Sequence, residues 1–309
     1  MTIASKIAKI LPKKTQNFIK PKYDFLRAKY FLKQRGGSYK YNKTYGGWLL
    51  NIPMPNNLDM LILARTYREF NRAVRFGTNK KDLLWKWINW IDNKSVVYDI
   101  GSANGLEGLS LAHLKSAHVH FIEPYTPSIE TILKTIYLTK LIKNKAIKSE
   151  VIHAACTNKE DYKRLSMHAQ PTPGETRNTY GDRKDYEEGG GRDRKKVIIS
   201  QSIKGISIDS LNYNYKLKSP EYVKIDVDGH ETLVINGALK TIKSKTVKSW
   251  AIEITGEERI KSITNIMKKN GYVVADDFDH YPGYKIRTID RFFMKKEYLE
   301  SWKNFKSPK

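Results

Sequence analysis

From residue 95 onward, short runs of β-branched and aromatic residues alternate with stretches of helical periodicity, and this alternation constrains the fold more than any other feature. Parallel strands need a crossover of about a dozen or more residues between them, which helices usually supply. We therefore predict a Rossmann-like α/β core, a mostly parallel sheet with helices on both faces. Strands are expected at 96–98, 118–122, 151–155, 221–226 and 249–254, and helices at 106–115, 127–143, 231–243 and 257–269.

The end of this core has a different pattern. Asn270-Gly271 is a pair that often ends a helix, and β-rich runs follow at 272–275 and 291–294. We predict that these two runs pair antiparallel. At the start of the core, apolar residues at three- and four-residue steps predict a helix over 82–92.

The chain divides into three parts by composition. Residues 1–80 are expected to form a basic N-terminal arm and a small pre-domain, residues 81–297 the core, and residues 298–309 a basic C-terminal tail. Within the core, residues 170–196 consist largely of Gly, Pro and charged residues. We expect no packed element in this insertion, which could instead act as a lid.

The formal net charge of +24 favours contact with phosphate polymers, anionic membranes or acidic saccharides. An AT-rich coding sequence would give a similar lysine-rich composition without any such partner. Ile3, Ile7 and Ile10 have helical spacing among basic residues, so residues 1–35 are a candidate contact with an anionic membrane. A solvated arm or a helix packed on the core explains them equally well.

The single cysteine, Cys156, excludes an internal disulfide and a multi-cysteine zinc site, and fits a reducing compartment. No run approaches the roughly 18 apolar residues of a membrane span. We therefore expect a cytoplasmic protein, with peripheral attachment at the inner membrane surface as an alternative. The sequence does not indicate an oligomeric state.

A glycine-containing turn between the first predicted strand and its helix is the clearest functional signal. Small residues let the backbone turn tightly and approach a ligand, and the helix N-terminus offers free N–H groups. The segment that we expect to hold a nucleotide-like cofactor contains Gly101, Ser102, Asn104 and Gly105.

Two acids distinguish this turn from a dinucleotide site, as does alanine at position 103 in place of glycine. Asp99 ends the first strand, where it could bind the amino group of a methionine moiety directly or through water. Glu123 ends the second strand, 24 residues later, at the spacing of an acid that receives ribose hydroxyls. A plain glycine turn with a surface Glu-Pro pair is the structural alternative.

The segment Lys224–Glu231 ends the fourth predicted strand, at the sheet edge where ligands bind in open α/β folds. We predict that Asp226 is the catalytic base, and that Asp228 and His230 assist it. A hydroxyl must lose its proton as it attacks a methyl group, which requires such a base. Glu231 is explained equally well as an acid that stabilises a helix N-terminus.

A divalent cation is a second role that these acids could have. Asp226, Asp228 and Glu253 offer the oxygen ligands that Mg²⁺ prefers, and the ion would orient vicinal hydroxyls. We do not predict a metal site from the sequence.

Taken together, these motifs resemble those of the FkbM-type methyltransferase family, in the same order over about 95–295. The further segments that carry the resemblance are Phe121–Pro124, Val151–Cys156, Ile206–Leu211 and Asn270–Tyr272. The resemblance implies an S-adenosylmethionine cofactor and O-methylation of a sugar, polysaccharide or glycosylated acceptor. It also places Pro124, Ala154 and Ala155 in the cofactor site, the two alanines near the adenine. The basic N-terminus and the 170–196 insertion lie outside the shared pattern.

Two other functions compete with this interpretation. An RNA ribose 2′-O-methyltransferase would use the same core and turn the basic surface toward phosphates. Methylation of bases is disfavoured, because the chain has neither an Asn/Asp-Pro-Pro-Tyr segment nor a Pro-Cys dipeptide. A non-enzymatic binding module would have lost parts of the pocket, yet the acids and glycines that cofactor binding requires are all present.

Overall fold

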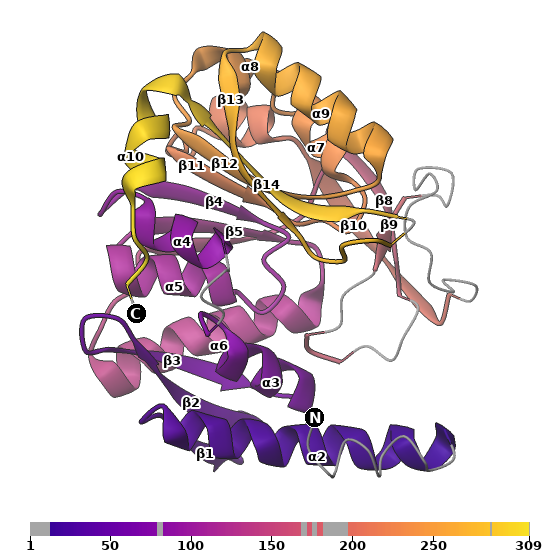
Figure 1. The fold of residues 1–309 in the computed structure, drawn as a ribbon. Coiled ribbons are helices and arrows are strands. Elements are labelled where there is room, and N and C mark those ends of the chain that lie inside the picture. Colours follow the sequence, from indigo (N-terminus) through magenta and orange to yellow (C-terminus); the bar gives the residue numbers. More distant parts are fainter. Residues whose placement is uncertain are drawn as a thin grey trace.

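A seven-stranded sheet forms the centre of the computed structural model, and helices cover both of its faces (Figure 1). The structure describes residues 13–78, 83–167, 172–174, 178–181, 197–284 and 286–308. In spatial order the strands are β13 (Tyr272–Asp279), β14 (Thr288–Lys295), β12 (Ser249–Thr255), β11 (Tyr222–Ile225), β4 (Val96–Ile100), β5 (His118–Glu123) and β6 (Ser149–His153).

The directions of these strands confirm the predicted core. β4, β5, β6, β11 and β12 run parallel to their neighbours in this group, whereas β14 runs antiparallel to both β12 and β13. The two C-terminal runs therefore pair antiparallel, as predicted. The order of the strands along the chain reverses between β4 and β11, which is where α/β sheets of this kind bind ligands.

Helices α4 (Leu83–Trp90), α5 (Leu106–Lys115) and α6 (Thr126–Lys143) lie on one face of the sheet, and α7 (Glu231–Asn236), α8 (Leu239–Ser244) and α9 (Glu257–Lys269) lie on the other (Figure 1). The single helix predicted over 231–243 is therefore divided. Its break is at Gly237, where a Cβ atom would lie 2.2 Å from the Thr157 carbonyl oxygen. Asp209 then starts α8 by accepting hydrogen bonds from the Lys240 and Thr241 N–H groups.

The N-terminal part adds a further layer to the core. It contains α2 (Lys13–Gln34), the antiparallel sheet of β1 (Ser38–Asn42), β2 (Gly47–Met54) and β3 (Leu58–Ala64), and α3 (Tyr67–Arg75). Its buried Leu32 and Phe70 belong to the same hydrophobic cluster as Val97 and Phe292 of the central sheet. The predicted helix around Ile3–Ile10 lies outside the described residues.

A second small sheet corrects two predictions. Its strand order is β7 (Ala155–Cys156), β10 (Ile199–Ile206), β8 (Asp161–Met167) and β9 (Thr179–Tyr180). The third core strand thus ends at His153, and Ala155 begins a different sheet. The expectation of no packed element within 170–196 is wrong for Thr179 and Tyr180, which are buried and pair with β8. Only Leu165 and Met167 of β8 are buried, so the hydrophobic pattern of this strand is weak in the sequence.

The C-terminal segment begins with a packed helix, although we predicted a basic tail. After η3 (Lys296–Tyr298), α10 (Leu299–Asn304) buries Trp302, which stacks on Phe292 at 5.5 Å between ring centroids. The remaining short element is η2 (Ser210–Asn214), a π-helical turn. No helix in the described part of the chain combines the length and apolarity required to cross a membrane.

Candidate active site

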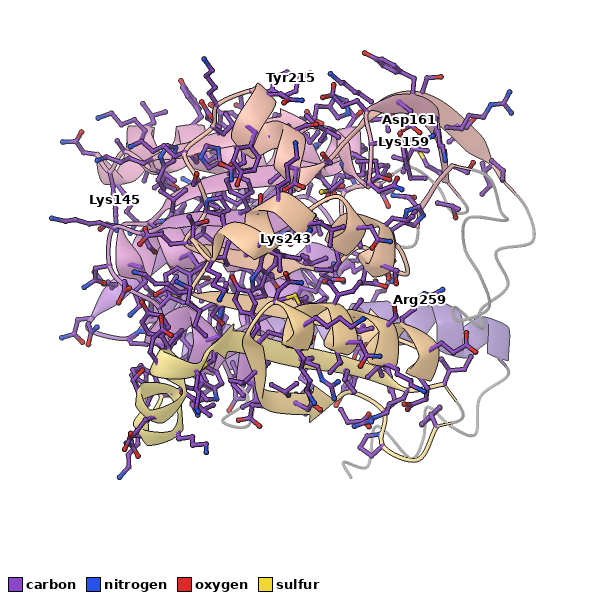
Figure 2. The ribbon with its side chains drawn as sticks, turned by 90° about the horizontal axis from the view of Figure 1, so that it is seen from above. Lys145, Lys159, Asp161, Tyr215, Lys243 and Arg259 are labelled. Carbon is purple, nitrogen blue, oxygen red and sulfur yellow. The ribbon has the colours of Figure 1, made fainter. Side chains whose placement is uncertain are left out.

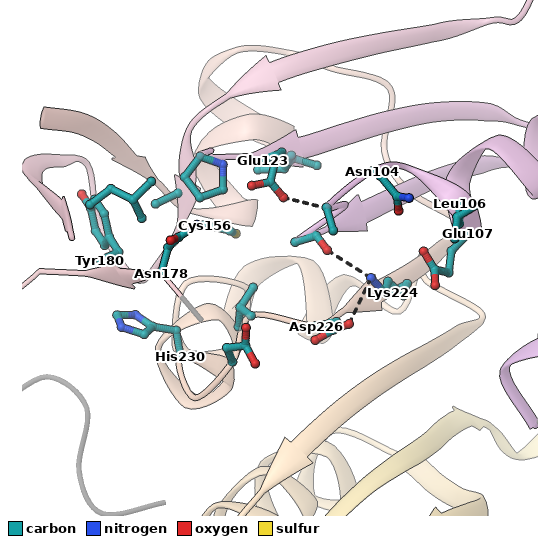
Figure 3. Close-up of a pocket in the computed structure, with 18 of the residues that line it drawn as sticks. Asn104, Leu106, Glu107, Glu123, Cys156, Asn178, Tyr180, Lys224, Asp226 and His230 are labelled. Atoms are coloured by element: carbon teal, nitrogen blue, oxygen red, sulfur yellow. Dashed lines mark hydrogen bonds and ion pairs between the residues drawn. The ribbon is translucent and has the colours of Figure 1, made fainter. Parts of the chain in front are cut away.

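A cavity of about 240 Å³ opens where β4, β5 and β11 end, at the point of strand-order reversal (Figure 3). The turn after β4 contributes Gly101, Ala103 and Asn104, and β5 contributes Glu123. The other lining residues come from α3 and the residue after it, from the start of α5, from the end of β5, from the second sheet and its loops, and from β11 and the loop after it: Arg72, Phe76, Leu106, Glu107, Ile122, Pro124, Ala155, Cys156, Leu165, Asn178, Tyr180, Lys224, Asp226, Val227, Asp228 and His230.

The glycine turn has a backbone that side chains strongly disfavour. Gly101 and Gly105 have φ values of +71° and +76°, and Ala103 has φ +48°. A Cβ atom at Gly101 would lie 1.8 Å from the Asp226 carbonyl oxygen, so glycine is required at this position by contact as well as by conformation. Ala103 accepts a strain of roughly 1–2 kcal/mol and directs its N–H to Glu123.

Glu123 is held by the backbone at the cavity wall. The Ala103 N–H donates to its Oε2 at 2.8 Å, and the Tyr125 N–H donates to its Oε1 at 2.9 Å. Burial raises the pKa of this carboxyl to about 7, against the opposing effect of these two N–H groups. Each carboxylate oxygen keeps a lone pair for another donor, so Glu123 fits the predicted role of receiving ribose hydroxyls.

Asp99, in contrast, does not line the cavity. Its side chain is fully buried, accepts from the Gly108 N–H at 3.1 Å, and lies 3.4 Å from Lys224 Nζ. The structure therefore does not show the predicted direct contact with a methionine amino group. Instead, Asp99 fixes the start of α5 and the lysine of the neighbouring strand.

The other predicted cofactor residues are divided in the same way. Asn104, Pro124 and Ala155 line the cavity together with Gly101 and Glu123. Ser102, Gly105 and Ala154 are buried behind it. Among the described residues, the buried Asn104 Nδ2 has no hydrogen-bond acceptor, so it is a donor that a bound carboxylate could use.

Lys224 is a central site residue that the sequence analysis named only as part of a motif. Its Nζ donates to the Gly101 carbonyl at 3.2 Å and lies 3.7 Å from Asp226 Oδ2 (Figure 3). Burial acts to lower the pKa of Lys224, but the charges of Asp99, Asp226 and Glu107 outweigh it and raise this pKa. A lysine within a buried central strand was the available signal.

A second cavity of about 300 Å³ adjoins the first. Four residues line both cavities: Phe76, Glu107, Lys224 and Asp226. The remaining walls of the second cavity are Leu84, Ile225, Ala251, Ile252, Glu253, Phe278, His280, Asp290 and Phe292. A group bound at the Lys224 end of the first cavity would therefore face the contents of the second.

Only one of the three predicted catalytic residues lies at this junction. Asp226 lines both cavities, whereas Asp228 and His230 line the first alone. The His230 ring packs edge-on against Tyr180, 6.3 Å away, at the opposite end of the first cavity from Lys224 (Figure 3). Glu231 accepts from the Gly229 N–H at 2.7 Å at the start of α7, consistent with its structural interpretation.

Several lining residues were not among the site residues predicted from the sequence. Phe76 follows α3, and Tyr180 belongs to β9 within the insertion. Cys156 lines the first cavity, but burial raises the pKa of its thiol to about 12, so it is neutral and a poor nucleophile.

Comparison with known proteins gave one family match. The model of the methyltransferase FkbM domain matches residues 99–274. No curated protein matches this chain.

Several solved structures are similar to this chain at 9–14% sequence identity. Methyltransferase FkbM from Methylobacillus flagellatus KT is 14% identical with a TM-score of 0.43, over 74% of this chain and 56% of that one. Precorrin-6y C5,15-methyltransferase from Geobacter metallireducens GS-15 is 9% identical with a TM-score of 0.39, over 69% and 87%. TYW2 of M. jannaschii in complex with AdoMet is 14% identical with a TM-score of 0.35, over 84% and 86%.

Proposed function

Because this chain belongs to the FkbM family and is an S-adenosylmethionine-dependent methyltransferase, we propose that it methylates a hydroxyl group of a sugar or similar polar acceptor. The observation that carries this proposal is the junction of the two cavities at Asp226. One cavity would hold the cofactor and the other the acceptor, with a carboxylate between them.

The first cavity suits the cofactor. Glu123 would accept hydrogen bonds from the ribose hydroxyls, and the Asn104 amide would donate to the methionine carboxylate. Tyr180 lies at the end away from Lys224 (Figure 3), and Ala155 belongs to the same buried cluster as Tyr180, so the adenine would lie there. This orientation would bring the methyl group to the Lys224 end, beside the second cavity.

The second cavity suits a neutral, hydroxyl-rich acceptor. Four carboxyl groups line it, from Glu107, Asp226, Glu253 and Asp290, together with the cation of Lys224. Such a lining repels phosphate and accepts hydrogen bonds from hydroxyls. Phe76, Phe278 and Phe292 add ring surfaces for the apolar parts of an acceptor.

The chemistry that this arrangement supports is a displacement at the methyl carbon. S-adenosylmethionine, when bound, supplies a methyl group on a positively charged sulfur. Asp226 would take the proton of the acceptor hydroxyl as its oxygen attacks, and Lys224 would hold Asp226 in position. The walls of the two cavities would align oxygen, carbon and sulfur, which contributes much of the rate.

RNA remains the alternative acceptor because of the +24 net charge. Figure 2 shows that the labelled lysines Lys145, Lys159 and Lys243 lie on separate parts of the surface. The acidic lining of the second cavity, rather than this outer surface, is what favours a sugar over an RNA ribose flanked by phosphates.

Incubation with S-adenosylmethionine labelled in its methyl group tests the proposal. Fractionated polysaccharide, lipid-linked glycans and RNA would be supplied separately, with Asp226→Asn as the control enzyme. We expect label in a glycan fraction, stable to mild base as a methyl ether is. Label in RNA alone would replace the sugar acceptor with the RNA alternative.

A further inference from the structure

Three potential metal ligands come together on one wall of the second cavity. Glu253 of β12 lies directly opposite Asp290 of β14 in the antiparallel register, and Phe278 of β13 lies opposite Asp290 on its other side. His280 follows β13, and its backbone N–H donates to the Thr288 carbonyl at 3.0 Å. Three neighbouring strands thus fix the backbones that carry these ligands.

The ligand atoms converge closely enough for one ion. His280 Nε2 lies 3.1 Å from Asp290 Oδ2 and 3.6 Å from Glu253 Oε2, and one atom of each residue lies within 4.8 Å of the others. Two ligands of a cation with bonds of about 2.0–2.2 Å are roughly 3.0–3.5 Å apart. A hydrogen-bonded pair would explain the contact of His280 with Asp290, but not the approach of Glu253 to the same nitrogen atom.

The surroundings of this trio favour a cation. The carboxyl groups of Glu107 and Asp226 line the same cavity as the trio. The side chains of Glu253, His280 and Asp290 are 29%, 28% and 14% exposed. These side chains are therefore accessible from the second cavity, where water or an acceptor could supply further ligands to the ion.

We propose that Glu253, His280 and Asp290 bind a divalent cation whose open coordination positions face the second cavity. One imidazole nitrogen with two carboxylates suits Mn²⁺ or Zn²⁺ better than Mg²⁺, which favours oxygen ligands. The metal ligands considered from the sequence were Asp226, Asp228 and Glu253. The proposed site keeps Glu253 but has His280 and Asp290 in place of the other two residues. Asp226 is thereby left to act as a base.

The cation would bind two neighbouring hydroxyls of the acceptor and direct one of them toward Asp226. This role rests on the proposed function, but cation binding itself does not. It would select acceptors with vicinal hydroxyls, because two adjacent oxygens can occupy the open positions of one ion.

Titration of the metal-stripped full chain with Mn²⁺, followed by electron paramagnetic resonance, tests the site without cofactor or acceptor. We expect one bound ion per chain, with affinity reduced at least about tenfold in Glu253→Gln and in His280→Ala. Glu257→Gln, which removes an exposed carboxylate on the nearby α9, is the matched control and should bind as the wild type does. Equal binding by all four proteins, or none by the wild type, would overturn the proposal.

Two further readouts separate this proposal from the proposed function. Affinity for S-adenosylmethionine should be unchanged in His280→Ala, which shows that the variant is folded. If Mn²⁺ binds but no fraction receives label, the proposed acceptor class fails and the metal site stands. If label is transferred at full rate by chelator-treated enzyme that binds no Mn²⁺, the metal site fails and the function stands.

Discussion

Asp226 is the residue on which the chemistry depends, because it alone among the predicted catalytic residues borders both cavities. We expect Asp226→Asn to lower kcat by at least about 10²-fold, since the amide cannot accept the hydroxyl proton. Affinity for S-adenosylmethionine should be nearly unchanged. Steady-state kinetics and calorimetry on the same preparation check both expectations, and an equal loss of cofactor affinity would make Asp226 a binding residue.

Gly101 shows how one residue determines the shape of the turn. Gly101→Ala would place Cβ 1.8 Å from the Asp226 carbonyl oxygen, which must move the loop that carries the base. We expect a clear loss of cofactor affinity and a lower unfolding temperature.

Gly46→Ala is the matched control for this substitution. Gly46 has φ +63° but nothing within 4 Å of a Cβ atom, so alanine there meets only the backbone strain of roughly 1–2 kcal/mol. Thermal unfolding of both variants measures the difference. Equal destabilisation, with cofactor affinity retained in Gly101→Ala, would show that the close contact does not matter.

At the scale of elements, α3 begins with a buried acid. The Glu69 N–H donates to Thr66 Oγ1 at 3.2 Å, and Glu69 Oε2 accepts from the Arg65 N–H at 2.7 Å. Burial raises the pKa of Glu69 to about 7. The folded protein therefore keeps this proton at pH values where the unfolded chain has released it. The contribution of Glu69 to the free energy of unfolding thus falls as pH rises from about 4.5 to 7.

Glu69→Gln should remove this pH dependence, because the amide oxygen still accepts from the Arg65 N–H and carries no charge. The difference in free energy of unfolding between variant and wild type should therefore change with pH. We expect it to favour the variant by on the order of 1–3 kcal/mol more at pH 8 than at pH 4. Denaturant unfolding at both pH values measures this difference, with Glu258→Gln at an exposed position of α9 as a charge-matched control. A pH-independent difference between variant and wild type would contradict the assigned pKa.

Helix α2 presents apolar and basic side chains to solvent. Leu26 and Tyr30 are 63% and 67% exposed, and Arg27 and Lys33 are exposed on the same helix. We expect salt-sensitive binding to vesicles that contain anionic lipid, reduced by Leu26→Glu. Cosedimentation measures it. Equal binding to uncharged vesicles would show that the basic side chains do not drive the contact, and no binding to either kind of vesicle would exclude the contact itself.

At the scale of the whole molecule, local motifs were predictable from the sequence and long-range neighbours were not. The positions of Gly101, in the turn after β4, and of Glu123, at the end of β5, were predictable because the signals for them lie within a few residues of each in the sequence. The second cavity joins Phe76 to Phe278, and only the packing of distant segments brings them together. Likewise, only the folded chain shows that the buried Asp99 side chain lies beside Lys224, which comes from a strand far along the chain.

Calorimetric titration of the full chain with S-adenosylmethionine, beside Glu123→Ala, tests the central claim most directly. We predict one binding site per chain in the wild type and a loss of about 1–3 kcal/mol of binding free energy in the variant. No binding by the wild type, or equal binding by both proteins, would contradict the assignment of the first cavity to the cofactor.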